Sequence, residues 1–519
     1  MNKRMKVTGV ALIVVLALLM SACSGNTGNS SKETAGNKGN QTQQSSSPEQ
    51  TQTDAPLEEV ELTWYYPNTL QSVQDIELVQ AEMNKIVKEK INASIKLMPL
   101  DWGAYDQKMN VMTGAGEEFD LMFTAPWSNN YFQNVSRGAL LPLDDLLVKH
   151  APALHATVPE SVWDATRVNG KIYGAINWQI IAMPYGVVID KKMVEKYNIN
   201  MDAVNTYEDL EPYLAAWNEP FTPLMYAKDN VDPFSRQPTY FGMDSIGEDS
   251  SVGWIRLADD KLQVVNQYTT DEFKQFTALM HKWYNAGYFP KDAALHTSAQ
   301  NSASAKAGQL EFFAFGSPIK PGVETEMKNA YQVDVVAKPL SEAVITTNRA
   351  IATMTGISST SKNPERAMMF LELINTDKNL YNLISNGIEG VHYTKVTDNV
   401  IQKSTENTGY NPNSDWMFGN QFNAYYTSPD IVGIWELTHE LNLSAKASPL
   451  IGFSFDPEPV KTELAQTSGV YQQYKDALLS GTADPGTLLP EFLEKLQQSG
   501  AEKIISEKQR QIDEWLKNK

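Results

Sequence analysis

The chain has 519 residues and carries 43 Lys and Arg against 62 Asp and Glu, so its formal net charge is −19 at pH 7. Such a charge repels nucleic acid and anionic lipid, and it argues against both as direct partners. The chain is also too long for a single core of about 250 to 300 residues. We therefore expect two lobes.

The N-terminus has the pattern of a secretion signal. Lys3, Arg4 and Lys6 precede an apolar run over residues 7–20, which is shorter than the roughly 20 residues of a permanent membrane span. Small residues and Cys23, the only cysteine of the chain, follow directly. The segment resembles that of bacterial lipoproteins, in which the cysteine carries diacylglycerol. We expect residues 1–22 to be removed and Cys23 to be lipidated, with a buried free cysteine as the less favoured alternative.

Residues 23–56 are expected to form a tether. After Cys23 they consist almost entirely of Gly, Ser, Thr, Asn, Gln, Lys, Glu and Pro, a composition that buries too little apolar surface to fold. No later apolar run is long enough to span a bilayer. The lipid would then be the sole anchor, and the protein would work at the outer face of the cytoplasmic membrane.

The first folded stretch alternates between strand and helix patterns. Alternation and β-formers predict strands, and apolar residues at helical spacing predict helices, the first with Asp75 at its start and Asn92 after its end. The expected order is strand 59–65, helix 76–87, strand 95–98, helix 105–113 closed by Gly114 and Gly116, and strand 119–123. Such a β-α-β-α-β unit has parallel strands by default.

Each of these strands is followed by an aromatic residue beside an amide or an acid. In open parallel sheets, ligands collect beyond the carboxyl ends of the strands. Sugar rings pack their C–H faces on aromatic planes, and their hydroxyls bind amides and carboxylates. The alternative is an aromatic side chain packed over the edge of the sheet. The candidate ligand-binding residues here are Tyr66, Asn68, Asp101, Trp102, Trp127 and Asn129.

Several segments resemble landmarks of the family 1 extracellular solute-binding proteins. Residues 119–123, 138–146 and 169–174 resemble three consecutive landmarks of that family. Residues 361–371 resemble its late N-lobe helix, with Asn363 as the expected cap and Pro364 in the first turn. Residues 386–393 are similar to a segment of the LplA-type lipoproteins, a carbohydrate-importer branch.

The resemblance implies the two-lobe periplasmic-binding-protein-like fold of type II, an α/β fold in which each lobe is a mixed sheet flanked by helices. The ligand cleft would lie at a hinge that the chain crosses several times. The expected N-terminal lobe comprises residues 57–178 plus 312–376. The expected C-terminal lobe comprises residues 179–311 plus 377–519.

The same resemblance places further residues near the hinge crossings, where they would face the cleft. These are Trp178, Gln179, Phe315, Glu389, His392 and Tyr393. For His392, a hydrogen-bonded structural role remains an equal alternative to ligand contact. Trp416, Asn420 and Tyr425 form another aromatic and polar group, for which core packing is the favoured interpretation.

Signals for catalysis and for metal binding are weak. Residues 359–362 satisfy the SxxK spacing, but no accompanying SDN or KTG is present, so we interpret them as a loop. The six histidines form no HExxH, and His150 and His155 do not share a helical face. No metal and no cofactor are expected.

We therefore expect a lipid-anchored, non-catalytic binding protein that captures an oligosaccharide and delivers it to the permease subunits of an ABC importer. It would act as a monomer, bind the membrane through its lipid alone, and bind no nucleic acid. Two alternatives stay open. One is a lipid-anchored glycosidase or polysaccharide lyase with similar aromatic subsites, and the other is a peptide-binding receptor.

Overall fold

The computed structural model describes residues 57–247, 250–309 and 311–518. The predicted signal segment, Cys23 and the tether lie outside the described residues, so the lipid anchor stays a prediction. Within the described part, no helix combines the length and the apolar character needed to cross a membrane.

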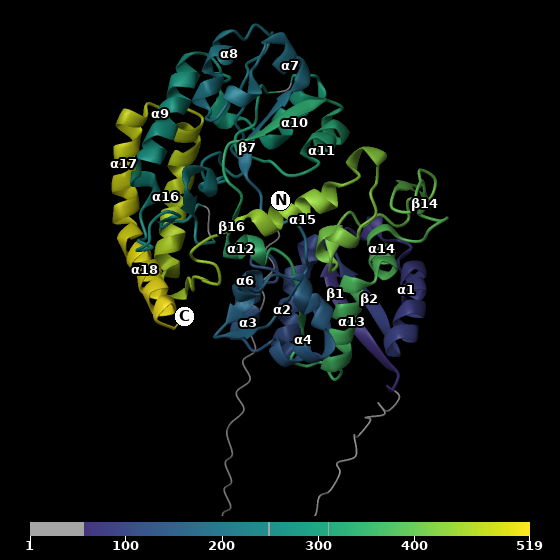
Figure 1. The fold of residues 1–519 in the computed structure, drawn as a ribbon. Helices are drawn as coiled ribbons and strands as arrows, with labels where there is room; N and C mark the ends of the chain where they lie inside the picture. Colours follow the sequence, from purple (N-terminus) through teal and green to yellow (C-terminus); the bar gives the residue numbers. More distant parts are fainter. Residues whose placement is uncertain (1–56, 248–249, 310, 519) are drawn as a thin grey trace, which may run out of the picture. The chain divides into compact units, whose positions relative to one another are not determined.

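A five-stranded sheet forms the centre of the first part of the fold (Figure 1). Its order is β2 (Ala93–Leu100), β1 (Val60–Pro67), β3 (Leu121–Thr124), β13 (Met354–Ile357) and β6 (Ala175–Ile176). Strand β1 is parallel to β2 and β3, whereas β13 is antiparallel to β3 and β6. The predicted parallel β-α-β-α-β opening is thereby confirmed.

The first two helices begin and end at residues that suit these positions. Helix α1 (Ile76–Ile91) ends at Asn92, which adopts the left-handed conformation. Helix α2 (Trp102–Ala115) starts three residues before the predicted range, because the Asp101 carboxylate accepts a hydrogen bond from the Gly103 N–H at 3.1 Å. It ends at Gly116, where φ is 66° and a Cβ would be strained.

The first hydrophobic core lies against this sheet. Trp64 is buried there, with its ring 5.5 Å from Phe370 and 5.7 Å from Phe418. Pro364 occupies the first turn of the helix that carries Phe370, as predicted, but the Asn363 side chain makes no capping hydrogen bond. The other helices of this part are α3 (Tyr131–Ser136), α4 (Asp144–His150), α5 (Pro152–Thr157), α6 (Glu160–Trp163), α13 (Pro364–Thr376) and α14 (Lys378–Asn386).

A second core surrounds a three-stranded antiparallel sheet of β10 (Ser317–Pro318), β7 (Tyr185–Asp190) and β11 (Val335–Pro339). Residue 186 must be glycine, because a Cβ there would lie 2.0 Å from the Lys338 carbonyl oxygen. The helices of this part are α7 (Lys191–Lys196), α8 (Glu211–Ala215), α9 (Asp271–Asn285), α10 (Ser298–Lys306) and α11 (Val323–Tyr331).

Three long C-terminal helices complete the second core. Helices α16 (Lys461–Leu479), α17 (Pro485–Gln498) and α18 (Ala501–Asn518) pack against one another, and α16 and α17 also contact α9 (Figure 1). Tyr471, Leu478 and Phe492 contribute buried side chains to this core. The end of the chain is therefore an integral part of the fold.

The remaining strands are short, and two further α-helices complete the set within the described residues. They are β4 (Arg167–Val168), β5 (Lys171–Ile172), β8 (Met243–Asp244), β9 (Ile255–Arg256), β12 (Val344–Ile345), α12 (Thr347–Ala350), β14 (Tyr393–Lys395), β15 (Ile401–Lys403), α15 (Ile434–Ser444) and β16 (Lys446–Ala447). The first core draws its buried residues from 62–182 and 345–424, and the second from 187–315 and 471–501. Residues such as Leu380, Tyr410 and Ala424 thus pack in the first core, although the predicted boundaries place them in the second lobe. The boundaries themselves stay a prediction.

Candidate functional site

Three tryptophan rings gather at the carboxyl ends of the first strands. The centroids of Trp102 and Trp127 lie 6.1 Å apart with 23° between their planes, and Trp416 lies 6.1 Å from Trp102 and 6.0 Å from Trp127. Trp102 is 37% exposed and Trp127 is 54% exposed. We call these three residues the tryptophan surface.

Local structure holds each ring in place. Trp102 is the first residue of α2, and Trp127, in the loop after β3, donates its indole N–H to the Ala352 carbonyl at 2.7 Å. Trp416 belongs to a short 3₁₀ helix, Asp415–Met417. The buried Phe123 ring lies 5.7 Å from Trp127 and 6.2 Å from Trp416. The tryptophan surface is thus backed by the first core.

A pocket of about 380 Å³ adjoins the tryptophan surface and shares Trp416 with it. Helix α11 and the residues before it form one side and pack on the second sheet. The other side comes from segments that pack on the first core. Its main polar and aromatic residues are Lys320, Glu326, Asn329, Asn386, Lys403, Asn411, Asn413, Asp415, Gln421, Tyr425 and Trp435. The pocket thus brings both cores to one hollow.

The charged groups of this pocket are unequally paired. Lys320 forms an ion pair with Glu326 at 2.6 Å, and the Asp415 carboxylate accepts a hydrogen bond from Gln421 Nε2 at 2.9 Å. Lys403 makes one long contact, from Nζ to the Asn386 carbonyl at 3.5 Å. Burial lowers the pKa of Lys403 to about 8, and the negative charge of Asp415 opposes this shift.

Backbone and side-chain contacts from the β1–α1 connection fix the loop that carries Asn411 to Trp416. Asn68 Nδ2 donates to Ser414 Oγ at 3.0 Å, and the Asn411 N–H donates to the Ser72 carbonyl at 2.7 Å. The predicted site residue Asn68 therefore supports the pocket from behind.

His392 is buried within the same support. Its Nδ1 accepts a hydrogen bond from the Ile388 N–H at 2.9 Å, and its Nε2 lies 3.2 Å from the Asp75 carboxylate. Both ring nitrogens are thus used inside the protein. Of the two interpretations left open for His392, the geometry favours the structural one.

Several other predicted site residues are buried as well. Tyr66 and Trp178 are each 1% exposed, and Trp178 packs on Phe422 and His439. Asn129 donates to the Phe123 carbonyl, Gln179 donates to Thr353 Oγ1, and Phe315 packs in the second core. The structure does not support direct ligand contact by these side chains. Such contact stays a prediction.

The remaining predicted residues have local roles. Asp101 caps α2, and the exposed Glu389 forms an ion pair with Lys395 at 3.2 Å. Tyr393 is 5% exposed, and its ring lies 6.1 Å from Tyr425. Of all the predicted residues, Trp102 and Trp127 are the two that the structure combines into an exposed surface.

Sequence reasoning missed most of the pocket. The expected core packing of Trp416 holds in part: the side chain is partly buried against the first core, and its ring also lies against Trp102 and Trp127. Lys403 stands in a hairpin strand, and Trp435 stands in the first turn of α15. The group of Trp416, Asn420 and Tyr425 was the available sequence signal, whereas no pattern pointed to Trp435 or Lys403.

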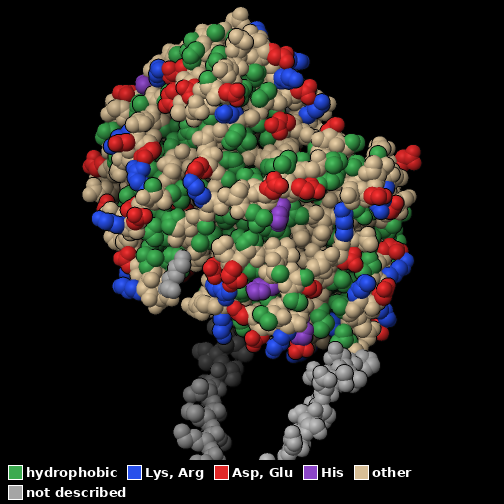
Figure 2. Space-filling model, in the orientation of Figure 1, with side chains coloured by type: hydrophobic (Ala, Val, Ile, Leu, Met, Phe, Trp, Pro, Cys, Tyr) green, Lys and Arg blue, Asp and Glu red, His purple; other side chains and the backbone are tan. Residues whose placement is uncertain are grey.

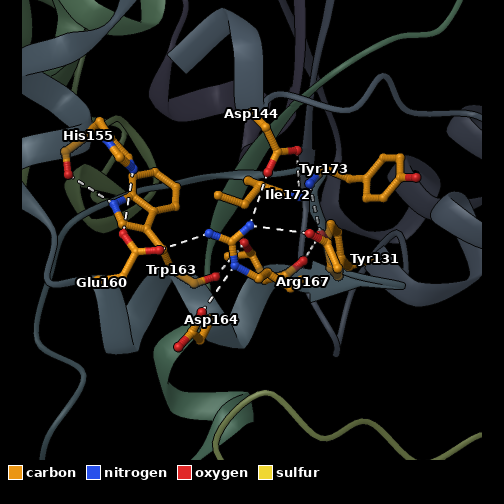
Figure 3. Close-up of polar contacts among 11 residues, drawn as sticks. Tyr131, Asp144, His155, Glu160, Trp163, Asp164, Arg167, Ile172 and Tyr173 are labelled. Atoms are coloured by element: carbon orange, nitrogen blue, oxygen red, sulfur yellow. Dashed lines mark hydrogen bonds and ion pairs between the residues drawn. The ribbon is translucent and has the colours of Figure 1, made fainter. Parts of the chain in front are cut away.

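Two further features were considered as sites. A broad hollow of about 510 Å³, lined by residues such as Trp217, Phe221 and Tyr288, lies on the second core and presents few charged groups. Arg167 lies among three acids (Figure 3): its guanidinium donates to Asp144, Glu160 and Asp164 at 2.8 to 3.1 Å. Because this cluster is internally paired, it serves the fold.

The face drawn in Figure 2 has no continuous basic patch that could bind a polyanion, because acidic and basic side chains are interspersed with apolar ones. Among the described residues, no group of three or more His, Cys, Asp or Glu side chains is arranged to hold a metal ion.

Two α/β cores that share a polar pocket beside exposed aromatic rings define a two-lobe solute-binding protein. A family model described as "bacterial extracellular solute-binding protein" matches residues 74–380, and a "domain of unknown function (DUF3502)" matches residues 449–517. The chain belongs to the bacterial extracellular solute-binding proteins, which confirms the predicted family and fold. Members of this family are binding proteins, so the prediction that the chain is not an enzyme is confirmed too.

Relatives agree with this assignment over nearly the whole chain. A carbohydrate ABC transporter substrate-binding protein of Streptococcus pneumoniae serotype 4 is 30% identical over 517 residues, covering 98% of each chain. The N-glycan transport solute-binding protein NgtS of Streptococcus pneumoniae is 28% identical, with a TM-score of 0.76 over 89% of this chain and 100% of that one. In its complex with Man5GlcNAc, NgtS matches 89% of this chain and 99% of its own with a TM-score of 0.62.

Proposed function

We propose that this protein captures an oligosaccharide outside the cell and delivers it to an ABC importer, and that it does so at the tryptophan surface and the adjoining pocket. The observation that carries this proposal is the arrangement of Trp102, Trp127 and Trp416. Two of the rings are exposed and stacked with 23° between their planes, and the third lines a pocket rich in amides and charged groups.

The chemistry of this arrangement suits a carbohydrate. A sugar ring presents apolar C–H faces that pack on aromatic planes, while its hydroxyls need hydrogen-bond partners in several directions. The tryptophan surface supplies the planes, and Asn386, Asn411, Asn413 and Asp415 supply amides and a carboxylate in the pocket. One sugar residue would stack on the tryptophan surface, and the next would enter the pocket.

The ligand we propose is an oligosaccharide of mannose and N-acetylglucosamine, because NgtS, the relative of similar length and fold, is described as an N-glycan transport protein. The partner we propose is the permease of a carbohydrate ABC importer, from the description of the 30% identical relative. We further propose that the protein acts as a monomer held at the outer face of the membrane by lipid on Cys23.

Capture would involve closure of two lobes about a hinge. A ligand drives such a change only if it binds the closed form better than the open one. The pocket supports this proposal, since one of its sides packs on the second sheet and the other on the first core, so a ligand could contact both. NgtS has a TM-score of 0.62 to this chain in its Man5GlcNAc complex and 0.76 in another of its crystal structures, as expected if glycan binding rearranges that protein.

The proposal is tested by isothermal titration calorimetry of Man5GlcNAc against the wild type, Trp127→Ala and Trp217→Ala. Trp217 is a matched control because it is also a partly buried tryptophan, but it lies on the second core. We expect saturable binding by the wild type and by Trp217→Ala, with a clear loss in Trp127→Ala.

Three results would count against the proposal. Equal loss in both variants would remove the tryptophan surface as the site. Release of shorter sugars after prolonged incubation would favour the alternative of a glycosidase or lyase. Binding of a peptide panel without binding of any glycan would favour the peptide receptor.

The lipid anchor has its own test. Cys23→Ala should appear in the medium or remain as an uncleaved precursor, because the thiol that would carry the lipid is gone. Retention of a processed Cys23→Ala protein in the membrane fraction would contradict the anchoring proposal without affecting the glycan proposal.

A further inference from the structure

Lys403 is the last residue of β15 and lines the pocket beside Asn386 and Asp415. An ammonium group has three N–H donors. The Asn386 carbonyl at 3.5 Å is at the outer limit of a hydrogen bond and satisfies one of these donors poorly. Burying a charged lysine without close hydrogen-bond partners costs folding free energy. A bound ligand that accepts hydrogen bonds from the ammonium group would offset this cost.

Trp435 also lines this pocket and carries a second donor. Its indole nitrogen is buried and has no hydrogen-bond partner among the described residues. The ring is held firmly, since it stacks on Tyr426 with 18° between the planes and contacts Phe422 edge to face. Buried indole N–H groups usually find a partner.

The charges around Lys403 decide what kind of partner fits. Across the pocket, Lys320 and Glu326 neutralise each other at 2.6 Å, and Asp415 offsets the charge of Lys403 itself. Beyond the Tyr425 ring, Lys395 is paired with Glu389. The formal charges of the residues that line the pocket therefore cancel. A carboxylate or phosphate on the ligand would bring an unbalanced negative charge next to Asp415.

We propose that Lys403 and the Trp435 N–H donate hydrogen bonds to an uncharged acceptor oxygen of the bound oligosaccharide. This inference rests on the proposed function and names the group that the pocket selects. The oxygen is either a sugar hydroxyl or the carbonyl of an N-acetyl group, and both present lone pairs without a charge. Neutral glycans are then preferred over glycans that carry acidic sugars.

The proposal has a consequence for proton binding. In the free protein, burial lowers the pKa of Lys403 to about 8, so a fraction of these lysines is neutral slightly above that pH. A ligand oxygen that accepts from the ammonium stabilises the charged form and raises the pKa. Glycan binding at pH 8.5 should therefore take up protons from the buffer.

Calorimetry with Man5GlcNAc tests these points in the wild type, Lys403→Met, Trp435→Phe and Lys395→Met. Loss of a bond from a charged donor should weaken binding by Lys403→Met about 10- to 100-fold, and Trp435→Phe should lose about 2- to 10-fold. Lys395 is the matched control, because it lies in the same hairpin and is already paired with Glu389. Its variant should bind like the wild type.

Proton uptake is measured by repeating the titration at pH 8.5 in two buffers with different ionisation enthalpies. The wild type and Lys395→Met should take up protons, whereas Lys403→Met should take up fewer. A second arm replaces Man5GlcNAc by the corresponding oligosaccharide of mannose alone. If Lys403→Met loses affinity for both ligands, the acceptor is a hydroxyl; if only for Man5GlcNAc, it is the N-acetyl carbonyl.

The outcomes separate this inference from the proposed function. Unchanged affinity in Lys403→Met, with wild-type binding intact, overturns the inference and leaves the glycan receptor standing. Tighter binding of a sialylated glycan than of its neutral counterpart overturns it too. Absence of glycan binding by the wild type instead refutes the proposed function. Unfolding of Lys403→Met would be detected by circular dichroism, and Trp435→Phe then carries the test.

Discussion

Two regions of this molecule place a cation among oxygen atoms, and they do so in opposite ways. Arg167 donates to three carboxylates and to the Gly170 carbonyl (Figure 3). Although burial acts against it, the hydrogen bonds that Arg167 donates to Glu160, Asp164 and Asp144 raise the pKa of its guanidinium. Lys403 has one long contact, and burial lowers its pKa to about 8. Arg167 thus finds its hydrogen-bond partners within the protein, whereas Lys403 has donors that a ligand can use.

This difference teaches how to separate structural clusters from binding sites. Both regions combine basic and acidic side chains, and from the sequence the Arg167 cluster has the denser charge. Only the Lys403 region adjoins a pocket, an unpartnered indole N–H and exposed aromatic rings. Unsatisfied donors beside a hollow indicate a site more clearly than the number of charges does.

Replacing Arg167 should give the largest change. Arg167→Ala leaves Asp144, Glu160 and Asp164 close together without a counter-ion. Because these carboxylates are 40 to 63% exposed, the free energy of unfolding should fall by about 1 to 3 kcal/mol. Urea denaturation followed by circular dichroism measures this change. Man5GlcNAc affinity should stay at the wild-type level, because no part of this cluster lines the pocket.

Arg510→Ala is the control for that prediction. Arg510 also pairs with two acids, but its side chain is half exposed, so we expect little or no loss of unfolding free energy. Equal losses in the two variants would show that the Arg167 cluster contributes no more than an ordinary surface ion pair.

A change at the tryptophan surface should have the next largest effect, on affinity. Removing the Trp416 ring takes away an apolar face worth about 1 to 3 kcal/mol, or roughly 5- to 150-fold in the dissociation constant for Man5GlcNAc. The unfolding midpoint should move less than the affinity. A Trp416→Ala protein that binds normally but unfolds easily would return Trp416 to the core-packing role first expected for it.

The smallest effect concerns stability and pH. Lys403 has a lower pKa in the folded state, about 8, than in the unfolded chain, where the ordinary value is about 10.4. Between these values the unfolded state binds more protons, so the stability contribution of this group rises with pH. The unfolding midpoint of the wild type should therefore rise relative to Lys403→Met between pH 7.5 and pH 9.5. A constant difference would mean that Lys403 titrates normally in the fold.

The local elements were predictable from sequence, and part of the site was. Strand and helix periodicities determine residues 60–124, and parallel strands bring their carboxyl ends to one edge. This rule correctly placed Trp102 beside Trp127. It did not extend to Trp178, which follows β6 but turns into the first core.

The pocket could not be predicted from sequence. Trp416 meets Trp102 across more than 300 residues of chain, and α11 is brought to the same hollow from the second core. Such contacts depend on tertiary packing, which no local pattern encodes. The lack of close hydrogen-bond partners for Lys403 likewise depends on which carbonyls and carboxylates surround it in the folded protein.

The central claim is that the tryptophan surface and its pocket bind an oligosaccharide, and a crystal structure of the complex with Man5GlcNAc tests it most directly. We expect one sugar ring stacked on Trp102 and Trp127 and an uncharged oxygen of the adjoining residue within hydrogen-bond distance of Lys403 Nζ. Ordered sugar in the hollow beside Trp217, with the tryptophan surface bare, would contradict the account.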